Sequence, residues 1–130
     1  GKVESYGHLS FDQFEQDQVI ALNHGEDDGA RTAGLTISDR SDASMLETMR
    51  RLDGLTGAAR EAEIAKLRAE NGVGQPRAFL GKDEDRASAL DLKDAEGRTR
   101  LRLHVAADGA ASIQFLDQAG RITRTMTPEG

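Results

Sequence analysis

Three arginines and a histidine alternate along one stretch of the chain: Arg98, Arg100, Arg102 and His104. Because side chains alternate between the two faces of a strand, all four would lie on one face. Guanidinium groups bind carboxylates and phosphates through paired hydrogen bonds, so this row predicts a weak binding site for a small anionic or saccharide ligand. The alternative is a charged outer surface that discourages edge pairing, with Asp91 as a local partner of Arg100.

Histidines and acidic residues offer two other kinds of site. His8, His24 and His104 could supply nitrogen ligands to zinc, but they lie far apart and lack metal-ligand spacing. The acidic runs 26–28 and 83–85 could supply oxygen ligands to calcium, but neither shows the alternating acids of a calcium loop. We therefore expect surface histidines and solvated loop acids, with no metal and no cofactor.

Serines cluster near acidic residues at the middle of the chain. Ser38, Ser41 and Ser44 lie close to Asp39 and Asp42, an arrangement that could suggest a nucleophile. No positioned histidine or glycine elbow accompanies them, so helix capping explains them better. No motif places a catalytic acid, base or nucleophile, and an enzyme is the least favoured class of function.

Composition limits the remaining classes. The chain has 130 residues, of which only 37% are hydrophobic and 4% aromatic, so one domain with a thin core is expected. A net charge of −6 argues against a nucleic-acid or anionic-membrane surface. The absence of cysteine removes disulfides, thiolate zinc sites and cysteine nucleophiles together. No apolar run approaches the roughly 18 residues of a membrane span, so we expect no membrane insertion and a soluble protein, with the cytoplasm slightly favoured.

A strand-and-turn unit occurs twice near the end of the chain. LDLKDAEGR at 90–98 and IQFLDQAGR at 113–121 share apolar alternation followed by Asp, two residues, Gly and Arg. They predict hairpins with four-residue loops at 94–97 and 117–120, and a three-residue loop at 107–109 lies between them. Glycine stands in each loop where a positive φ is needed.

The loop lengths predict how the strands pair. Counting back from each loop gives three pairings: Leu90 with Leu101, Leu103 with Ile113, and Phe115 with Ile122. The apolar residues of these strands then lie on a single face: Leu90, Leu92, Leu101, Leu103, Val105, Ile113, Phe115, Ile122 and Met126. Leu116 falls on the polar face and Arg124 on the apolar face, which an edge position or a partner would explain.

The first half of the chain adds strands and helices. Alternation predicts three strands through Leu9 and Phe11, through Ile20 and Leu22, and over 31–39, with a loop at 23–30 before the third. Helical spacing then predicts one helix from Met45, capped by Ser41 or Asp42 and ending near Gly54. A second helix runs from Thr56 to Asn71 or Gly72, and 72–76 forms a linker.

The predicted fold is α+β and mainly β: an antiparallel β meander of short hairpins with a two-helix insertion. It is a single domain over 1–130, with N-terminal strands in 1–40, the helical pair in 41–72 and the C-terminal meander in 76–127. The apolar face of the sheet needs a cover. Since the helices offer few large apolar residues, we expect partial cover by the helices, completed by oligomerisation.

The repeats also carry a resemblance. The stretch 89–121, with GHLSFDQFEQDQVIAL and GLTISDR before it, resembles a group of uncharacterised bacterial proteins built from short β repeats with DxxGxxR turns. The resemblance spans most of the chain and implies a β-repeat fold without implying an activity. Because members of the group carry further strands upstream, it also implies that this chain is a C-terminal part of a longer protein.

Three classes of function follow in order. The first is a non-enzymatic structural module that assembles into a homo-oligomer, because repeated hairpins would leave an apolar face to be covered. The second is a binding module for a small anionic or saccharide ligand through the arginine-lined face. The third is an enzyme.

Overall fold

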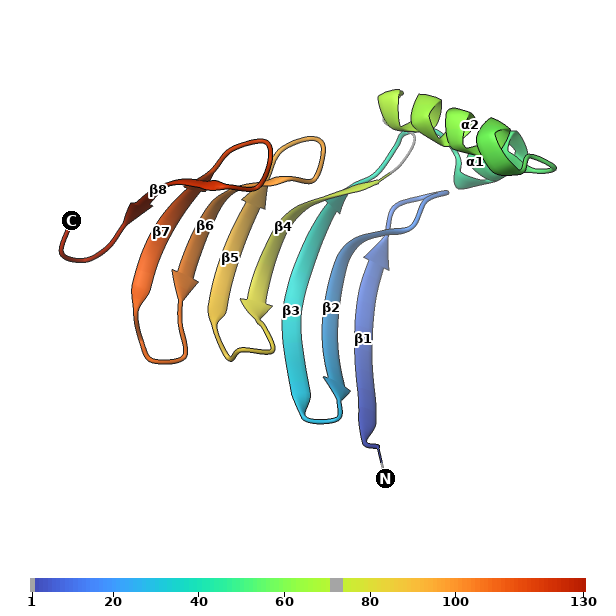
Figure 1. Ribbon diagram of the computed structural model, residues 1–130. Coiled ribbons are helices and arrows are strands. Elements are labelled where there is room, and N and C mark those ends of the chain that lie inside the picture. The colour runs from blue at the N-terminus through green and yellow to red at the C-terminus, as the bar shows by residue number, and fades with distance from the viewer. Residues whose placement is uncertain (1, 71–73) are drawn as a thin grey trace.

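The computed structural model describes residues 2–70 and 74–130. It contains one eight-stranded antiparallel sheet in which strands adjacent in sequence are neighbours in space (Figure 1). The strands are β1 (Glu4–Asp12), β2 (Gln18–Asp27), β3 (Ala30–Asp39), β4 (Gln75–Lys82), β5 (Ser88–Lys93), β6 (Thr99–Val105), β7 (Ala111–Leu116) and β8 (Ile122–Met126). Two helices are inserted between β3 and β4, so the predicted α+β, mainly β meander is confirmed.

Both helices begin close to their predicted starts, and the first also ends close to its predicted end. Helix α1 spans Met45–Leu52 and helix α2 spans Gly57–Ala69. The cap of α1 is Ser44, whose hydroxyl oxygen accepts a hydrogen bond from the Leu46 N–H at 3.2 Å. The prediction of Ser41 or Asp42 as this cap was wrong, because both lie too far from the first turn. The predicted end of the second helix, at 71 or 72, lies outside the described residues.

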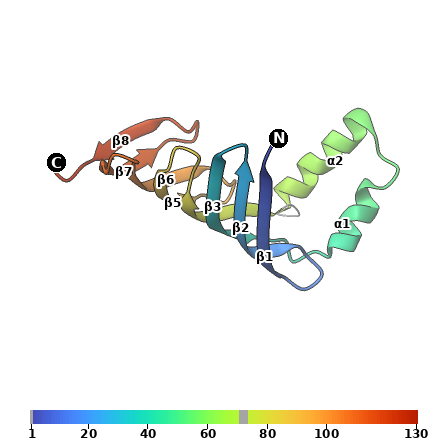
Figure 2. The ribbon, with the colours of Figure 1, turned by 90° about the horizontal axis from the view of Figure 1, so that it is seen from below.

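The helical pair lies beyond the ends of the strands and beside β1 (Figures 1 and 2). The β1–β2 loop holds it there, since the Met45 N–H donates to the Glu15 carbonyl oxygen at 2.8 Å. Arg51 of α1 pairs with Glu63 of α2 at 2.7 Å, which joins the helices to each other. Within the described residues, neither helix covers a face of the sheet. The expected partial cover by the helices was therefore wrong.

Two hairpin turns repeat one set of hydrogen bonds. In the turn between β5 and β6, one carboxylate oxygen of Asp94 accepts from the backbone N–H groups of Glu96 and Arg98, at 3.1 and 3.0 Å. The other oxygen accepts from the Arg98 guanidinium at 2.9 Å. Gly97 has φ +78°, the left-handed conformation that closes the turn at little cost to glycine. Asp117, Gly120 and Arg121 make the same turn between β7 and β8.

The pairing of the strands differs in part from the prediction. The middle hairpin is confirmed, with Leu103 opposite Ile113. In the hairpin before it, the Asp94 N–H donates to the Arg98 carbonyl oxygen, so the loop is one residue shorter than predicted. A bulge between Leu92 and Lys93 adds a further offset of one, and Leu90 therefore lies opposite Leu103 rather than Leu101.

The last hairpin shows the same two-residue error. Phe115 lies opposite Arg124, whereas the prediction placed it opposite Ile122. Beyond each bulge the offset is two, which keeps side chains on their predicted face because the faces alternate with a period of two. Between the bulge and the turn the offset is one, so Ile122, predicted on the apolar face, lies opposite Leu116, predicted on the polar face. The predicted division into faces therefore holds except beside these two turns.

The predicted loop at 23–30 was also wrong. Strand β2 continues to Asp27 and β3 begins at Ala30, so only Asp28 and Gly29 form the turn. Their φ angles are +49° and +95°, as a tight two-residue hairpin turn requires. The Asp-Gly pair is a strong signal for this turn, and the acidic run around it had suggested a longer loop.

Strands β3 and β4 approach closely where two glycines face each other across the strands. Gly34 lies opposite Gly81, and the ring of Phe79 covers both. A Cβ on Gly81 would collide with the Ala33 carbonyl oxygen and come within 2.7 Å of the Gly34 Cα. Glycine is thus required here so that an aromatic ring can cover the strand backbone.

We expect Gly81→Ala to lower the free energy of unfolding by about 1–3 kcal/mol, because the added methyl group forces the strands or the Phe79 ring to move. Urea unfolding followed by circular dichroism measures this change. Gly7→Ala is the matched control, since its new Cβ would meet only the His24 Cβ at 3.8 Å. Equal effects of the two variants would contradict the close approach.

We expect the Asp117 carboxyl group to titrate below the ordinary value near 3.9. Hydrogen bonds from the Arg121 backbone N–H, and then from its guanidinium, lower the pKa of Asp117. The turn is thus stabilised above the pKa of the unfolded chain, and this stabilisation is lost as the pH falls through the folded-state pKa. NMR titration of the Asp117 side chain should show a midpoint that rises in Arg121→Ala, and an unchanged midpoint would contradict the contact.

Candidate functional site: the apolar face of the sheet

An aliphatic row crosses the whole sheet, with one residue from each strand. We call it the leucine row: Leu9, Leu22, Leu35, Leu80, Leu90, Leu103, Ile113 and Met126. Each member lies directly opposite the next, so neighbouring Cβ atoms are about 4.5–5.5 Å apart. The row is therefore continuous from one edge strand to the other.

A second row runs beside the first, two residues along each strand. It contains Phe11, Ile20, Ile37, Ala78, Leu92, Leu101, Phe115 and Arg124. Since residues two apart in a strand share a face, both rows lie on one side of the sheet, which we call the apolar face. The other side, the polar face, carries residues such as Thr36, Asp91 and Gln114.

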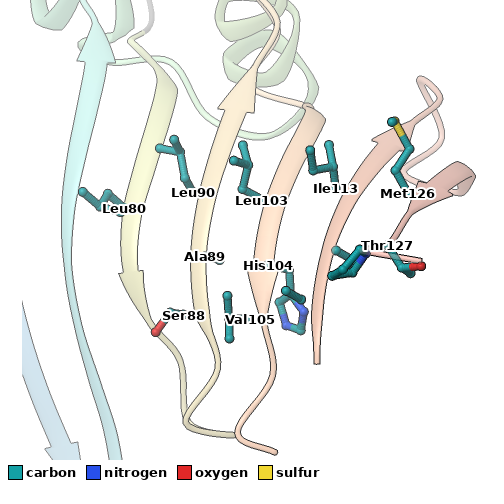
Figure 3. A pocket seen from close by; sticks show the side chains of 13 residues that line it. Leu80, Ser88, Ala89, Leu90, Leu103, His104, Val105, Ile113, Met126 and Thr127 are labelled. Atoms are coloured by element: carbon teal, nitrogen blue, oxygen red, sulfur yellow. The ribbon is translucent and has the colours of Figure 1, made fainter. Parts of the chain in front are cut away.

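The apolar face is open to solvent. Leu9 and Leu80 are each 55% exposed, and Leu103, in the sixth strand, is still 40% exposed. Over strands β4 to β8 the face contains a hollow with a volume of about 510 Å³. Figure 3 shows Leu80, Leu90, Leu103 and Ile113 in a line across this hollow, which Met126 continues at its far end.

The total exposed area shows how much of the chain lacks a cover. A monomeric globular protein of 14.0 kDa exposes about 6,700 Å². This chain exposes 8922 Å², an excess of roughly 2,200 Å² over that expectation. Part of the excess belongs to the projecting helices, and part is the uncovered face. Only Ala21, Leu67 and Ala87 are buried hydrophobic residues among those described.

The two rows contain one charged residue. Arg124 lies on β8 opposite Phe115, at the end of the second row. Its guanidinium has no hydrogen-bond or ion-pair partner in residues 2–70 and 74–130. The sequence prediction that Arg124 falls on the apolar face is thus confirmed.

Of the predicted ligand site, Arg98, Arg100 and Arg102 are not among the residues that line the hollow, whereas His104 is one of them (Figure 3). Arg102 already has an intramolecular partner, because its guanidinium donates to both carboxylate oxygens of Asp91 at 2.6 and 2.7 Å. Asp91 is only 6% exposed, and its carboxylate raises the pKa of the Arg102 guanidinium.

The other two arginines also have acidic neighbours. Arg98 pairs with Asp94 and Glu96 at 2.9 and 2.8 Å, and Arg100 lies 3.6 Å from the Asp94 carboxylate. These partners neutralise the charge that an anion would need. Binding of a small anion at this row stays a prediction.

The histidines do not converge. The His8 Nδ1 lies 2.5 Å from the Asn23 side-chain oxygen, which accepts, and the His8 ring stacks on Tyr6, while His24 lies 3.3 Å from the Ser5 hydroxyl. His104 is on β6, across the sheet from both. In the part of the chain that the structure describes, no three histidine or acidic side chains lie close enough together to hold a metal ion.

The serines and acidic runs have local roles. Ser44 caps α1, as the capping interpretation predicts, whereas the Ser41 hydroxyl oxygen accepts from the Ala43 N–H at 2.9 Å in the segment before the helix. Glu26 pairs with Arg31 at 2.8 Å. Asp83 accepts from the Ala87 N–H at 2.9 Å and so closes the β4–β5 turn.

Sequence reasoning missed the N-terminal half of the leucine row. The alternation of Leu9 with Phe11 and of Ile20 with Leu22 was the available signal. It could not show that these strands continue the same sheet face as Leu90 and Leu103, because the two-helix insertion separates them in sequence.

Comparisons with known proteins found no matching family model, curated protein or solved structure. The resemblance to bacterial β-repeat proteins therefore stays a prediction. Among the described residues, no helix is both long and apolar enough to cross a membrane.

We expect Arg102→Ala to lower the free energy of unfolding by about 1–3 kcal/mol, because Asp91 would lose its charged partner while staying largely buried. Chemical denaturation measures the loss. Arg121→Ala is the control, since its ion pair with Asp117 is exposed and should contribute less than about 1 kcal/mol. A smaller loss in Arg102→Ala than in Arg121→Ala would contradict this role of Asp91.

Proposed function

We propose that this chain is a non-enzymatic structural module that assembles with further copies of itself through the apolar face. The main support for this proposal is the leucine row, which crosses all eight strands and is not covered by any other part of the described residues. Contiguous apolar surfaces of this extent are typical of interaction sites.

The chemistry of the face favours another apolar sheet as the partner. Its two rows contain aliphatic and phenylalanine side chains and only one charge, and such rows match the inner face of a β-sandwich. A small polar ligand would leave most of this surface in water.

The polar face supports a structural rather than a catalytic role. Its buried acid, Asp91, is held in an ion pair with Arg102, and the repeated aspartates close turns. These groups stabilise the strands and turns, and each already has a partner.

The test is the molar mass in solution by light scattering, measured over a hundredfold range of concentration. We expect an oligomer whose melting temperature rises with concentration, because association stabilises the folded state. Leu103→Glu should weaken association at least tenfold, since a carboxylate would enter the apolar interface.

Gln114→Glu is the matched control, because Gln114 lies on the adjacent strand β7, on the polar face and outside the hollow. It should leave the mass unchanged. If Leu103→Glu fails to fold, Leu103→Ala still tests the interface, since it should weaken association without adding a charge. A wild-type monomer at every concentration would overturn the proposal.

A further inference from the structure

We propose that two copies stack apolar face on apolar face, with β1 of each copy lying over β8 of the other. This inference rests on the proposed assembly function and specifies its stoichiometry and orientation. Three observations carry it: the size of the side chains in the two rows, the exposed area, and the position of Arg124.

Side-chain size favours two sheets. Packed sheets lie about 10 Å apart, so the side chains of each must fill about 5 Å, which leucine and isoleucine do. A trimer could instead close three such sheets into a triangular prism. Eight strands at about 4.8 Å between neighbours span roughly 34 Å, so the axis of this prism would lie about 10 Å from each sheet. At the middle of the sheet the rows carry only Ala78, Leu80, Leu90 and Leu92, which are too short to reach that axis.

The exposed area also fits a pair. The helices account for part of the excess of roughly 2,200 Å², so two chains would bury less than about 4,400 Å² in total. Even half of that total, about 2,200 Å², lies within the range of obligate homodimers. A single apolar face supplies the contact on both chains, as a two-fold interface requires.

Arg124 decides between the two orientations that keep the strands aligned. If β8 lay over β8, two unpaired guanidinium groups would approach each other in an apolar interface, which is unfavourable. If β8 lies over β1, Arg124 meets the opposite end of the second row. There Phe11 offers an aromatic ring that is 58% exposed. A cation over this ring is favourable.

The chain has no cysteine, so introduced cysteines report contacts without background. Leu9→Cys and Met126→Cys mark the two ends of the leucine row. Within one chain these ends are roughly 34 Å apart, beyond the reach of a short bismaleimide. We expect covalent dimers from the double variant and from a mixture of the two single variants, and none from either single variant alone. A Leu9→Cys sample that crosslinks to itself would overturn the orientation.

The measured mass separates this inference from the function on which it rests. Light scattering should give about 28 kDa, twice the 14.0 kDa of one chain. A trimer or larger assembly would overturn the two-sheet stack and leave assembly standing, whereas a monomer would overturn both.

Arg124→Leu tests what sets the orientation. Without the like-charge repulsion, the dimer should remain and Leu9→Cys should begin to crosslink to itself. Arg121→Leu is the control, because Arg121 is 80% exposed and paired with Asp117, and it should leave the crosslinking pattern unchanged. An unchanged pattern in Arg124→Leu would show that Arg124 does not set the orientation.

Discussion

A single-layer sheet with one apolar side cannot bury that side by itself, and this constraint governs the rest of the molecule. Burial of apolar area is the main favourable term in folding, at about 25 cal/mol per Å². Here the leucine row crosses eight strands, and the helices that could have covered it lie beyond the strand ends. The folded chain therefore keeps a large surface whose burial would stabilise it, and association is the direct way to bury it.

The polar face and the turns show how the strands stay ordered despite the thin core. Asp94 and Asp117 each bind two backbone N–H groups and an arginine, which fixes the ends of the hairpins. Gly34 and Gly81 let the Phe79 ring cover the strand backbone. These local contacts hold single hairpins, whereas the apolar face connects all of them. The proposed assembly would therefore bury the one surface that connects all the hairpins.

The sequence was a good guide to the faces and a weaker guide to the register. Alternation placed Leu90, Leu103 and Phe115 on one side correctly, because the period of a strand survives an offset of two. The exact pairing failed in two of three hairpins. A bulge beside each turn added one residue, and a bulge depends on how neighbouring strands twist rather than on a local motif.

The sequence by itself determined the strands, the turn chemistry and the presence of an apolar face, since each depends on alternation or on a few adjacent residues. Only the tertiary structure decided that β1 to β3 and β4 to β8 form one sheet with a continuous leucine row. It also placed the helices away from the sheet and paired Asp91 with Arg102. These features depend on contacts between residues distant in sequence, and alternation within a strand carries no information about which strand lies next to it.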